Sequence, residues 1–147
     1  MTLKVSPQTH ITHHEEETLN FGRTLAAQLV PPLCVLLTGD LGAGKTTLTK
    51  GIAEGMGAAL RENVTSPTFT LIHEYRGAKT AVYHIDLYRI ETERELESLG
   101  LRELMTQNAI LLIEWGEKFP WLVELCDLHI TIDRTNEDER TIAVRRK

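Results

Sequence analysis

A glycine-rich turn between an apolar run and a helix-forming run constrains this chain most strongly. Residues 33–37 read LCVLL, and the turn that follows contains Gly39-Asp-Leu-Gly-Ala-Gly44-Lys45-Thr46. This spacing of glycine, lysine and threonine is the phosphate-binding P-loop, whose glycines let successive backbone N–H groups point toward phosphate oxygens. A strand over 33–39 and a helix over 45–56 are the flanking elements that the motif requires. A tight glycine turn beside a surface lysine is the alternative interpretation.

The P-loop assigns a chemical role to each part of the turn. Lys45 is expected to reach the β- and γ-phosphates of a nucleotide, and the Thr46 hydroxyl is expected to ligate Mg²⁺. The helix that starts near Lys45 adds the positive end of its dipole. We therefore predict a cofactor site that spans the whole turn, namely Gly39, Asp40, Leu41, Gly42, Ala43, Gly44, Lys45, Thr46 and Thr47.

Two acidic residues at the ends of expected strands are candidates for metal binding and catalysis. Asp86 ends the alternating run VYHID, and Glu114 follows the wholly apolar run AILLI. In P-loop enzymes, such carboxylates hold Mg²⁺ through water and orient an attacking water. We expect Thr46, Asp86 and Glu114 around the metal, and Lys45, Asp86 and Glu114 as catalytic residues. A capping or solvated carboxylate is the alternative at each strand end.

The remaining pattern predicts one α/β fold. Helical spacing covers residues 15–29 and, with a break at Gly100, residues 91–105, whereas two β-rich pairs read as hairpins over 68–89 and 127–147. We predict a single P-loop NTPase-like domain over residues 1–147. Its central sheet is expected to be mixed and mostly parallel, flanked by helices, with antiparallel hairpins.

Composition restricts the function classes. The formal net charge of −5 and the pI near 5.7 argue against a protein that holds nucleic acid mainly through its own basic surface. Cys34 and Cys126 lie in apolar runs and are expected to be buried thiols in a reducing compartment. No apolar run approaches the roughly 20 residues that span a bilayer, and no signal segment is evident, so we expect a soluble cytoplasmic protein.

Three further segments have less specific patterns. The stretch NVTSPTFT, residues 63–70, contains Thr65, Ser66, Pro67 and Thr68, which fit either a capped loop or a loop that senses a γ-phosphate. The histidines at 10, 13 and 14 are expected on the surface. Tyr88 and Trp115 follow the two strand-end acids closely and are expected to wall the site, face a partner or pack in the core.

Five motifs in this order resemble the TsaE family, formerly YjeE. They are GDLGAGKTTLTKGIAEGMG, VTSPTFTLIHEY, YHIDLYR, LESLGLREL and LLIEW, and the resemblance covers about residues 15–135. It implies a small P-loop ATPase of the bacterial machinery that makes threonylcarbamoyladenosine in tRNA. The resemblance further implies ATP and Mg²⁺ as cofactors, slow hydrolysis by the isolated protein, and TsaB- and TsaD-type proteins as partners. Contact with tRNA would be indirect, and ATP hydrolysis would reset the TsaB–TsaD transferase complex between turnovers.

Carried over by motif, the resemblance implies roles for named residues. It assigns phosphate binding to Gly42, Gly44, Lys45, Thr46 and Thr47, with Thr46 as a metal ligand. It favours the switch interpretation of Thr65, Ser66, Pro67 and Thr68, and it makes Asp86 and Glu114 the important acids. For the adenine pocket it suggests the segment around His14 and Glu15 together with the turn near Arg134.

Two other functions stay open at this stage. A P-loop kinase of small molecules has a similar size, but the arginines after the P-loop helix are scattered and no arginine-bearing lid is evident. A non-enzymatic, nucleotide-gated interaction module would need binding without hydrolysis. A GTPase is disfavoured because the chain contains no Asn-Lys-x-Asp to read guanine.

Overall fold

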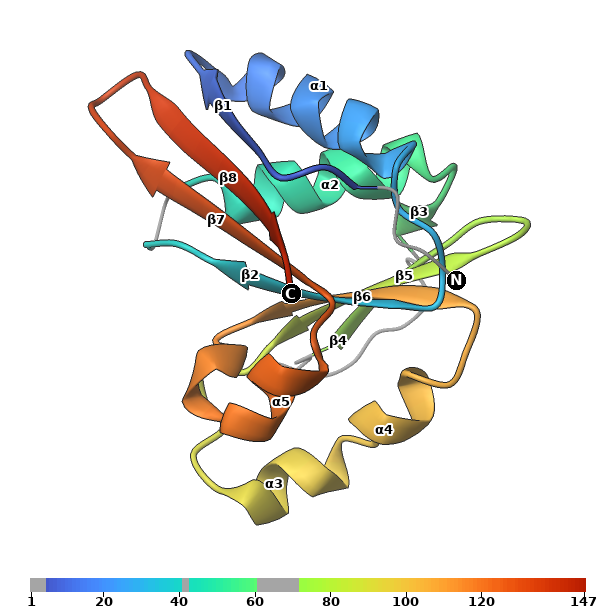
Figure 1. The fold of residues 1–147 in the computed structure, drawn as a ribbon. Coiled ribbons are helices and arrows are strands. Elements are labelled where there is room, and N and C mark those ends of the chain that lie inside the picture. The colour runs from blue at the N-terminus through green and yellow to red at the C-terminus, as the bar shows by residue number, and fades with distance from the viewer. Residues whose placement is uncertain (1–4, 41–42, 61–71) are drawn as a thin grey trace.

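A mixed β-sheet organises the computed structural model, which describes residues 5–40, 43–60 and 72–147 (Figure 1). These residues form an eight-stranded sheet in the order β1-β8-β7-β2-β6-β5-β4-β3. The four central strands β7, β2, β6 and β5 run parallel, whereas β1, β8, β4 and β3 join antiparallel at the two edges. The strands are β1 (Gln8–Thr12), β2 (Leu33–Thr38), β3 (Ala59–Leu60), β4 (Ile72–Arg76), β5 (Ala81–Asp86), β6 (Ala109–Glu114), β7 (Leu128–Arg134) and β8 (Arg140–Arg146).

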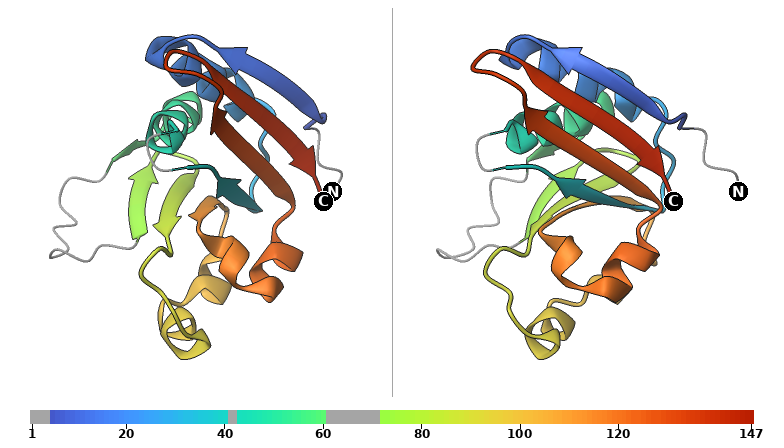
Figure 2. Two further views of the ribbon diagram at one scale, coloured as in Figure 1. Left: turned by 90° about the vertical axis from the view of Figure 1, so that its left-hand side faces the viewer. Right: turned by 60° about the vertical axis from the view of Figure 1, so that its left-hand side comes forward.

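Helices cover both faces of the sheet and give three layers (Figures 1 and 2). Helices α1 (Glu15–Ala26) and α2 (Lys45–Gly55) lie on one face. On the other face lie four short helices, namely α3 (Glu93–Ser98), α4 (Leu101–Leu104), the 3₁₀ helix η1 (Gly116–Lys118) and α5 (Pro120–Leu125). The predicted α/β fold class is therefore confirmed.

The central strands are apolar on both sides because each side packs on a helical layer. In β2, Val35 and Leu37 belong to the core under α1 and α2, whereas Cys34 and Leu36 belong to the core over α3 to α5. The same alternation divides β5 and β6 between the two cores. Cys34 and Cys126 are buried free thiols, as their apolar contexts predict.

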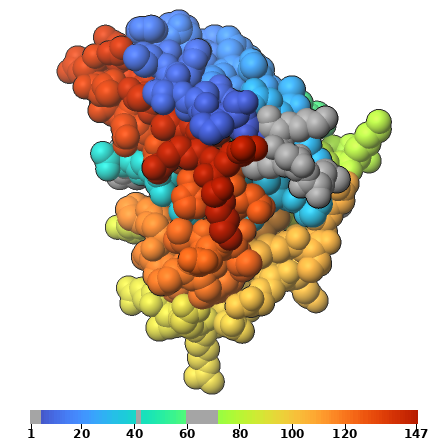
Figure 3. All heavy atoms as spheres, viewed as in Figure 1, coloured from blue at the N-terminus to red at the C-terminus, as the bar shows by residue number. Residues whose placement is uncertain are grey.

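The two ends of the described chain lie side by side. Strand β1 pairs with β8 from Gln8↔Val144 to Thr12↔Arg140, and Figure 3 shows the N-terminal segment against the C-terminal strand. Both predicted hairpins are present, as β4–β5 and β7–β8, and residues 68–71 of the first predicted hairpin lie outside the described residues. The predicted helix break at Gly100 is also present, with φ 71° at that residue. None of the described helices is long and apolar enough to cross a membrane.

Some elements differ from the sequence prediction. Helix α1 ends at Ala26, earlier than the expected residue 29, with Ala27 as its C-cap. Strand β1, the two-residue β3, η1 and α5 have no counterpart in the prediction. These elements are short, so their periodicity is too brief to distinguish a helix or strand from a loop.

Helices α1 and α2 touch backbone to backbone through glycines. A Cβ atom on Gly51 would lie 2.3 Å from the carbonyl oxygen of Leu19, and one on Gly55 would lie 2.6 Å from that of Arg23. Gly22, on α1, faces the same contact, because its Cβ would lie 2.7 Å from the Leu48 carbonyl oxygen. The close approach fixes the position of α2, and therefore of the P-loop at its start, relative to α1.

We predict that Gly51→Ala destabilises the fold. The added methyl group forces the helices apart, and overpacking of this kind costs about 1–3 kcal/mol, more than the roughly 1 kcal/mol that alanine gains in a helix interior. The matched control is Lys50→Ala, since Lys50 is exposed on the same helix. Urea unfolding followed by circular dichroism should show a lower midpoint for Gly51→Ala and a midpoint near wild type for Lys50→Ala. An unchanged midpoint for Gly51→Ala would contradict the packing argument.

Candidate functional site

The P-loop connects the carboxyl end of β2 to the first turn of α2. Gly39 has φ 157°, and a Cβ there would lie 2.3 Å from the Ile132 carbonyl oxygen. Gly44 has φ 108° and is the N-cap of α2. A side chain would clash at Gly39 and strain the backbone at Gly44, so glycine is required at both positions. Leu41 and Gly42, also expected in the cofactor site, lie outside the described residues.

The first backbone N–H groups of α2 lie ahead of the helix's own hydrogen-bond ladder. No side chain caps the helix at Gly44 in the described part of the chain, and the bond from Leu48 N to Gly44 O at 2.9 Å begins the helical ladder. The N–H groups of Lys45, Thr46 and Thr47 therefore precede the ladder. Together with the helix dipole, they form a site suited to an anion.

Lys45 is a buried cation between the P-loop and β6. Its side chain is 9% exposed, and Nζ donates a hydrogen bond to the Gly39 carbonyl oxygen at 2.7 Å. The same atom lies 3.2 Å from Glu114 Oε1 and 5.2 Å from the centre of the Trp115 ring. The ammonium group is thus held at the base of the loop by a carbonyl oxygen, a carboxylate and an aromatic face.

The two strand-end acids lie next to each other. Strands β5 and β6 are parallel, and Asp86 is the register partner of Glu114. Alternation places Asp86 on the face of Val82 and Glu114 on the face of Leu112, which is the face that α1 and α2 cover. Asp86 Oδ1 accepts a hydrogen bond from Tyr88 N at 2.9 Å. The structure therefore brings both acids to the P-loop edge of the sheet.

His84 is a site residue that our sequence interpretation missed. Its Nε2 lies within hydrogen-bond distance of Glu114 Oε2, so Glu114 contacts Lys45 with one oxygen and His84 with the other. Burial by itself raises the pKa of Glu114, but the hydrogen bond and charge of His84 and the Lys45 ammonium outweigh it and hold this pKa below its ordinary value. The spacing of two residues between His84 and Asp86 was a usable signal, because it places both side chains on one face of a strand.

These residues line a large cavity of about 1210 Å³. Pockets for small ligands typically hold roughly 300–1000 Å³, so the cavity exceeds the usual range. Its described lining comes from the P-loop, the strand ends and two further segments, namely residues 13–18 and the β7–β8 turn. The lining residues are His13, His14, Glu15, Thr18, Asp40, Ala43, Gly44, Lys45, Thr46, Thr47, His73, Tyr75, His84, Asp86, Tyr88, Glu114, Trp115, Glu137, Asp138 and Arg140.

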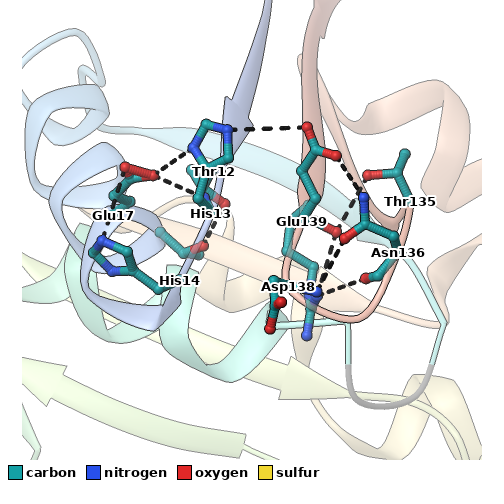
Figure 4. Close-up of polar contacts among 10 residues, drawn as sticks. Thr12, His13, His14, Glu17, Thr135, Asn136, Asp138 and Glu139 are labelled. Carbon is teal, nitrogen blue, oxygen red and sulfur yellow. Dashed lines mark hydrogen bonds and ion pairs between the residues drawn. The ribbon is translucent and has the colours of Figure 1, made fainter.

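The two segments at the rim contact each other (Figure 4). His13 Nδ1 lies 2.9 Å from Glu17 Oε1 at the start of α1, and its Nε2 lies 4.0 Å from Glu139 Oε1 beside the β7–β8 turn. Glu139 in turn accepts a hydrogen bond from Asn136 Nδ2 at 2.6 Å. His13 and His14 are exposed, as the sequence predicted for them, and both also line the cavity.

The structure distinguishes two arginines of the β7–β8 hairpin. Arg134, expected near the adenine pocket, directs its guanidinium toward the Glu137 carbonyl oxygen at 3.4 Å and is absent from the described cavity lining. Arg140 lines the cavity, and its Nε donates to the Ala43 carbonyl oxygen in the P-loop at 3.0 Å. Our sequence interpretation missed Arg140. Arg134 and Arg140 are register partners in the hairpin, and the sequence does not show which side chain reaches the P-loop.

The other expected site residues lie as follows. Glu15 lines the cavity, where its Oε1 accepts from Thr47 Oγ1 at 3.5 Å. Thr46 is exposed at the cavity wall. Tyr88 and Trp115 form an edge-to-face pair with ring centres 5.1 Å apart, and Tyr88 is 62% exposed. The switch candidates Thr65, Ser66, Pro67 and Thr68 lie outside the described residues.

Among the described residues, no group of three or more His, Cys, Asp and Glu side chains is arranged to hold a metal ion. Magnesium bound beside nucleotide phosphates takes one or two protein ligands, with phosphate and water oxygens as the rest. Thr46, Asp86 and Glu114, the residues expected around the metal, all line this cavity.

A three-layer α/β sheet with a P-loop after its central strand defines the class: this is a P-loop nucleotide-binding protein. Comparison with known families gives the particular family. Residues 12–142 match the family model described as threonylcarbamoyl adenosine biosynthesis protein TsaE. The chain belongs to the TsaE family.

Individual relatives agree with this assignment. The chain is 43% identical over 124 residues to the tRNA threonylcarbamoyladenosine biosynthesis protein TsaE of Haemophilus influenzae, which covers 81% of this chain and 77% of the relative. It is 43% identical over 131 residues to the protein of the same name from Bacillus subtilis, covering 89% and 80%. The crystal structure of Bacillus subtilis YdiB superposes with a TM-score of 0.73 at 35% identity, covering 97% of this chain and 88% of that one.

We predict that Arg140→Ala weakens nucleotide binding about fivefold, because losing one hydrogen bond to the loop removes about 1 kcal/mol of support. Arg134→Ala is the matched control on the same hairpin and should change the dissociation constant less than about twofold, the range of a surface substitution. Calorimetric titration with ADP measures both variants. Equal losses in the two variants would mean that charge on the hairpin, rather than the contact with Ala43, supports binding.

Proposed function

We propose that this protein is a cytoplasmic, Mg²⁺-dependent ATPase that supports the threonylcarbamoyladenosine modification of tRNA. It acts with TsaB- and TsaD-type partners, and its ATP hydrolysis resets their complex between turnovers. The observation that carries the proposal is the buried contact between Lys45 of the P-loop and Glu114 at the end of β6. It supports the proposal because the cation that would bind phosphate and the acid that would orient water are in contact and line the same cavity.

The P-loop fits a polyphosphate on the geometry of its own atoms. Gly39 allows the loop to approach the Ile132 backbone, and the first turn of α2, whose N–H groups precede the helical ladder, lines the cavity. Lys45 supplies the one positive charge at the floor of the loop in the described structure. A nucleotide with its β- and γ-phosphates here would replace Glu114 as the partner of the ammonium group.

Each polar side chain at the strand ends has a distinct proposed role. Thr46 and Asp86 hold the metal, which neutralises charge on the phosphates when it is bound. Glu114 accepts a hydrogen bond from the attacking water and aligns it, because its pKa lies below the ordinary value and keeps it ionised near neutral pH. The backbone of the P-loop and Lys45 stabilise charge that develops on the phosphate oxygens.

ATP is the nucleotide we assign to the cavity. The sequence contains no guanine-reading Asn-Lys-x-Asp motif. The cavity continues from the P-loop to His14, Glu15 and the β7–β8 turn, which leaves room for a base and ribose beyond the phosphates. We place the base between these two segments.

Partner binding is proposed to depend on the nucleotide. The residues Thr65, Ser66, Pro67 and Thr68 follow the P-loop helix in sequence, where P-loop proteins keep segments that respond to a γ-phosphate. Tyr88 is an exposed aromatic side chain beside the cavity, next to Trp115. Exposed aromatic residues are enriched where protein partners bind, so the partner is expected to cover this edge of the cavity. Contact with tRNA would then pass through the complex.

We predict that Lys45→Ala abolishes tight nucleotide binding. Removing Nζ deletes the charge that phosphate recruits, and the Glu114 carboxylate retains His84 as its partner, so the fold should persist. Lys50→Ala, on the exposed side of the same helix, is the control and should bind as wild type. Calorimetric titration with Mg-ATP measures affinity, and circular dichroism checks the fold. Near-wild-type affinity in Lys45→Ala would overturn the phosphate site.

We predict that Glu114→Gln and Asp86→Asn fail in different ways. Glu114→Gln keeps the shape of the side chain and loses the charge that aligns water, so bound ATP should be hydrolysed at least about tenfold more slowly, a loss of roughly 1.4 kcal/mol or more. Asp86→Asn should weaken Mg²⁺-dependent affinity as well as turnover. Single-turnover hydrolysis of pre-bound ATP, with the partner proteins present, separates the two.

The same assay tests the proposed function as a whole. Wild-type protein with TsaB- and TsaD-type partners should hydrolyse ATP faster than wild-type protein in isolation. Absence of hydrolysis in the complete mixture would reject the ATPase. Unchanged hydrolysis in Glu114→Gln would remove that residue from the catalytic set, and a loss of metal dependence in Glu114→Gln instead of Asp86→Asn would exchange the two roles.

A further inference from the structure

Glu114 is a buried carboxylate with two separate partners. The residue is 6% exposed. Oε1 pairs with the Lys45 ammonium at 3.2 Å, and Oε2 accepts a hydrogen bond from His84. An ionised carboxylate has no proton to give, so Nε2 of His84 is the donor in that contact. Each oxygen therefore depends on a different element of the fold, namely α2 and β5.

Phosphate binding disturbs one of these two partners. Lys45 is the residue whose ammonium a P-loop directs at nucleotide phosphates, yet in this structure Nζ is held by Glu114 and the Gly39 carbonyl oxygen. When Nζ turns to a phosphate, Glu114 loses its cation although the residue is only 6% exposed. A buried carboxylate without a partner is strongly destabilising, so the transfer of Lys45 needs a second group that stays with Glu114.

We propose that His84 is the positioning residue that stays with Glu114 and holds its carboxylate in place while Lys45 leaves for the phosphates. The proposal rests on the proposed function only in taking nucleotide phosphates as the group that recruits Lys45. His84 acts through Glu114 and touches no phosphate itself.

The backbone around His84 suits this role. His84 lies inside β5, where it pairs with His73 of β4 on one side and with Leu112 of β6 on the other. Two neighbouring strands thus fix its Cα position, and the residue is 9% exposed. From this position the side chain reaches diagonally to Glu114, two residues beyond Leu112 on the same face of β6. Lys45, by contrast, begins a helix whose first turn borders the cavity.

A role in packing makes a different prediction from a role in positioning. Packing would be satisfied by an apolar side chain of similar volume, whereas positioning needs an N–H donor near the place of Nε2. Leucine fills part of the space without a donor, and glutamine can present an amide N–H at about the distance of Nε2 from the backbone. Comparing His84→Leu with His84→Gln therefore separates volume from hydrogen bonding.

The test is a double-mutant cycle on ADP affinity in Mg²⁺-free buffer with chelator, measured by calorimetry. Without Mg²⁺, the measured affinity does not depend on metal binding and reports the movement of Lys45 to the phosphates. His84→Leu should weaken ADP binding at least about fivefold. In this variant Glu114 keeps only Lys45, so recruiting Lys45 to the phosphate leaves the buried carboxylate with no partner. His84→Gln should stay within about twofold of wild type. In a Glu114→Gln background, His84→Leu should change affinity less than about twofold, because a neutral amide needs no replacement partner.

Several outcomes would overturn the proposal. An equal loss from His84→Leu in both backgrounds would show that His84 acts by packing. A loss in His84→Gln as large as in His84→Leu would do the same, and unchanged affinity in His84→Leu would show that Lys45 leaves without help. Urea unfolding of each variant checks the fold, and if His84→Leu does not fold, His84→Met replaces it in the cycle.

The result is independent of whether the protein hydrolyses ATP. The cycle measures ADP binding, so an inactive wild-type protein in the complete mixture would reject the ATPase and leave the His84 result intact. Conversely, additivity in the cycle would reject the positioning role while the single-turnover assay still supports the ATPase. The two failures are therefore distinguishable.

Discussion

The parallel register of β2, β6 and β5 is the constraint on which the site depends. Parallel strands end at the same edge of a sheet, so the P-loop after β2, Glu114 at the end of β6 and Asp86 at the end of β5 meet without any special loop. The register partners Leu37↔Glu114 and Asp86↔Glu114 place the three strand ends at one level. Burial on both faces stabilises these strands, and their order fixes the distances at the site.

The packing of α1 against α2 positions the first turn of α2 over the strand ends. Contact between α1 and α2 through Gly22 and Gly51 brings α2 close to α1 over the sheet, so the first turn of α2 faces the strand ends. A second support comes from the hairpin, where Arg140 donates to the Ala43 carbonyl oxygen and Ile132 leaves no room for a side chain at Gly39. The P-loop is therefore held from α1, from β7 and from β8, which limits the movement that phosphate binding must overcome.

The sequence predicted the parts of this structure that depend on local pattern. The P-loop spacing, the apolar runs of β2 and β6 and the two hairpins are readable because each signal lies within a few residues. Strand β1 and the 120–125 helix were missed because they are short and stabilised by distant partners, such as β8 for β1. His84 and Arg140 were missed for a related reason, since their importance comes from contacts with Glu114 and Ala43, which sequence order does not show. The buried state of Lys45 likewise depends on β6, which lies more than fifty residues further along the chain.

Under the proposed function, the charge of the cavity wall affects whether a nucleotide can enter with or without its cation. The described lining contains six acidic side chains but two cationic ones, Lys45 and Arg140, and Arg140 is directed at the loop carbonyls. A free polyphosphate would meet a wall of its own sign at the rim, from Glu15, Glu137 and Asp138. Attraction must then come from Lys45, from the N–H groups of the α2 first turn and from a divalent cation that arrives with the phosphates. Because the acids Asp86 and Glu114 lie beside Lys45, the same side chains that repel bare phosphate attract the metal-bound form. Under the proposed function, we therefore expect the cavity to favour a nucleotide that carries its cation over one that does not.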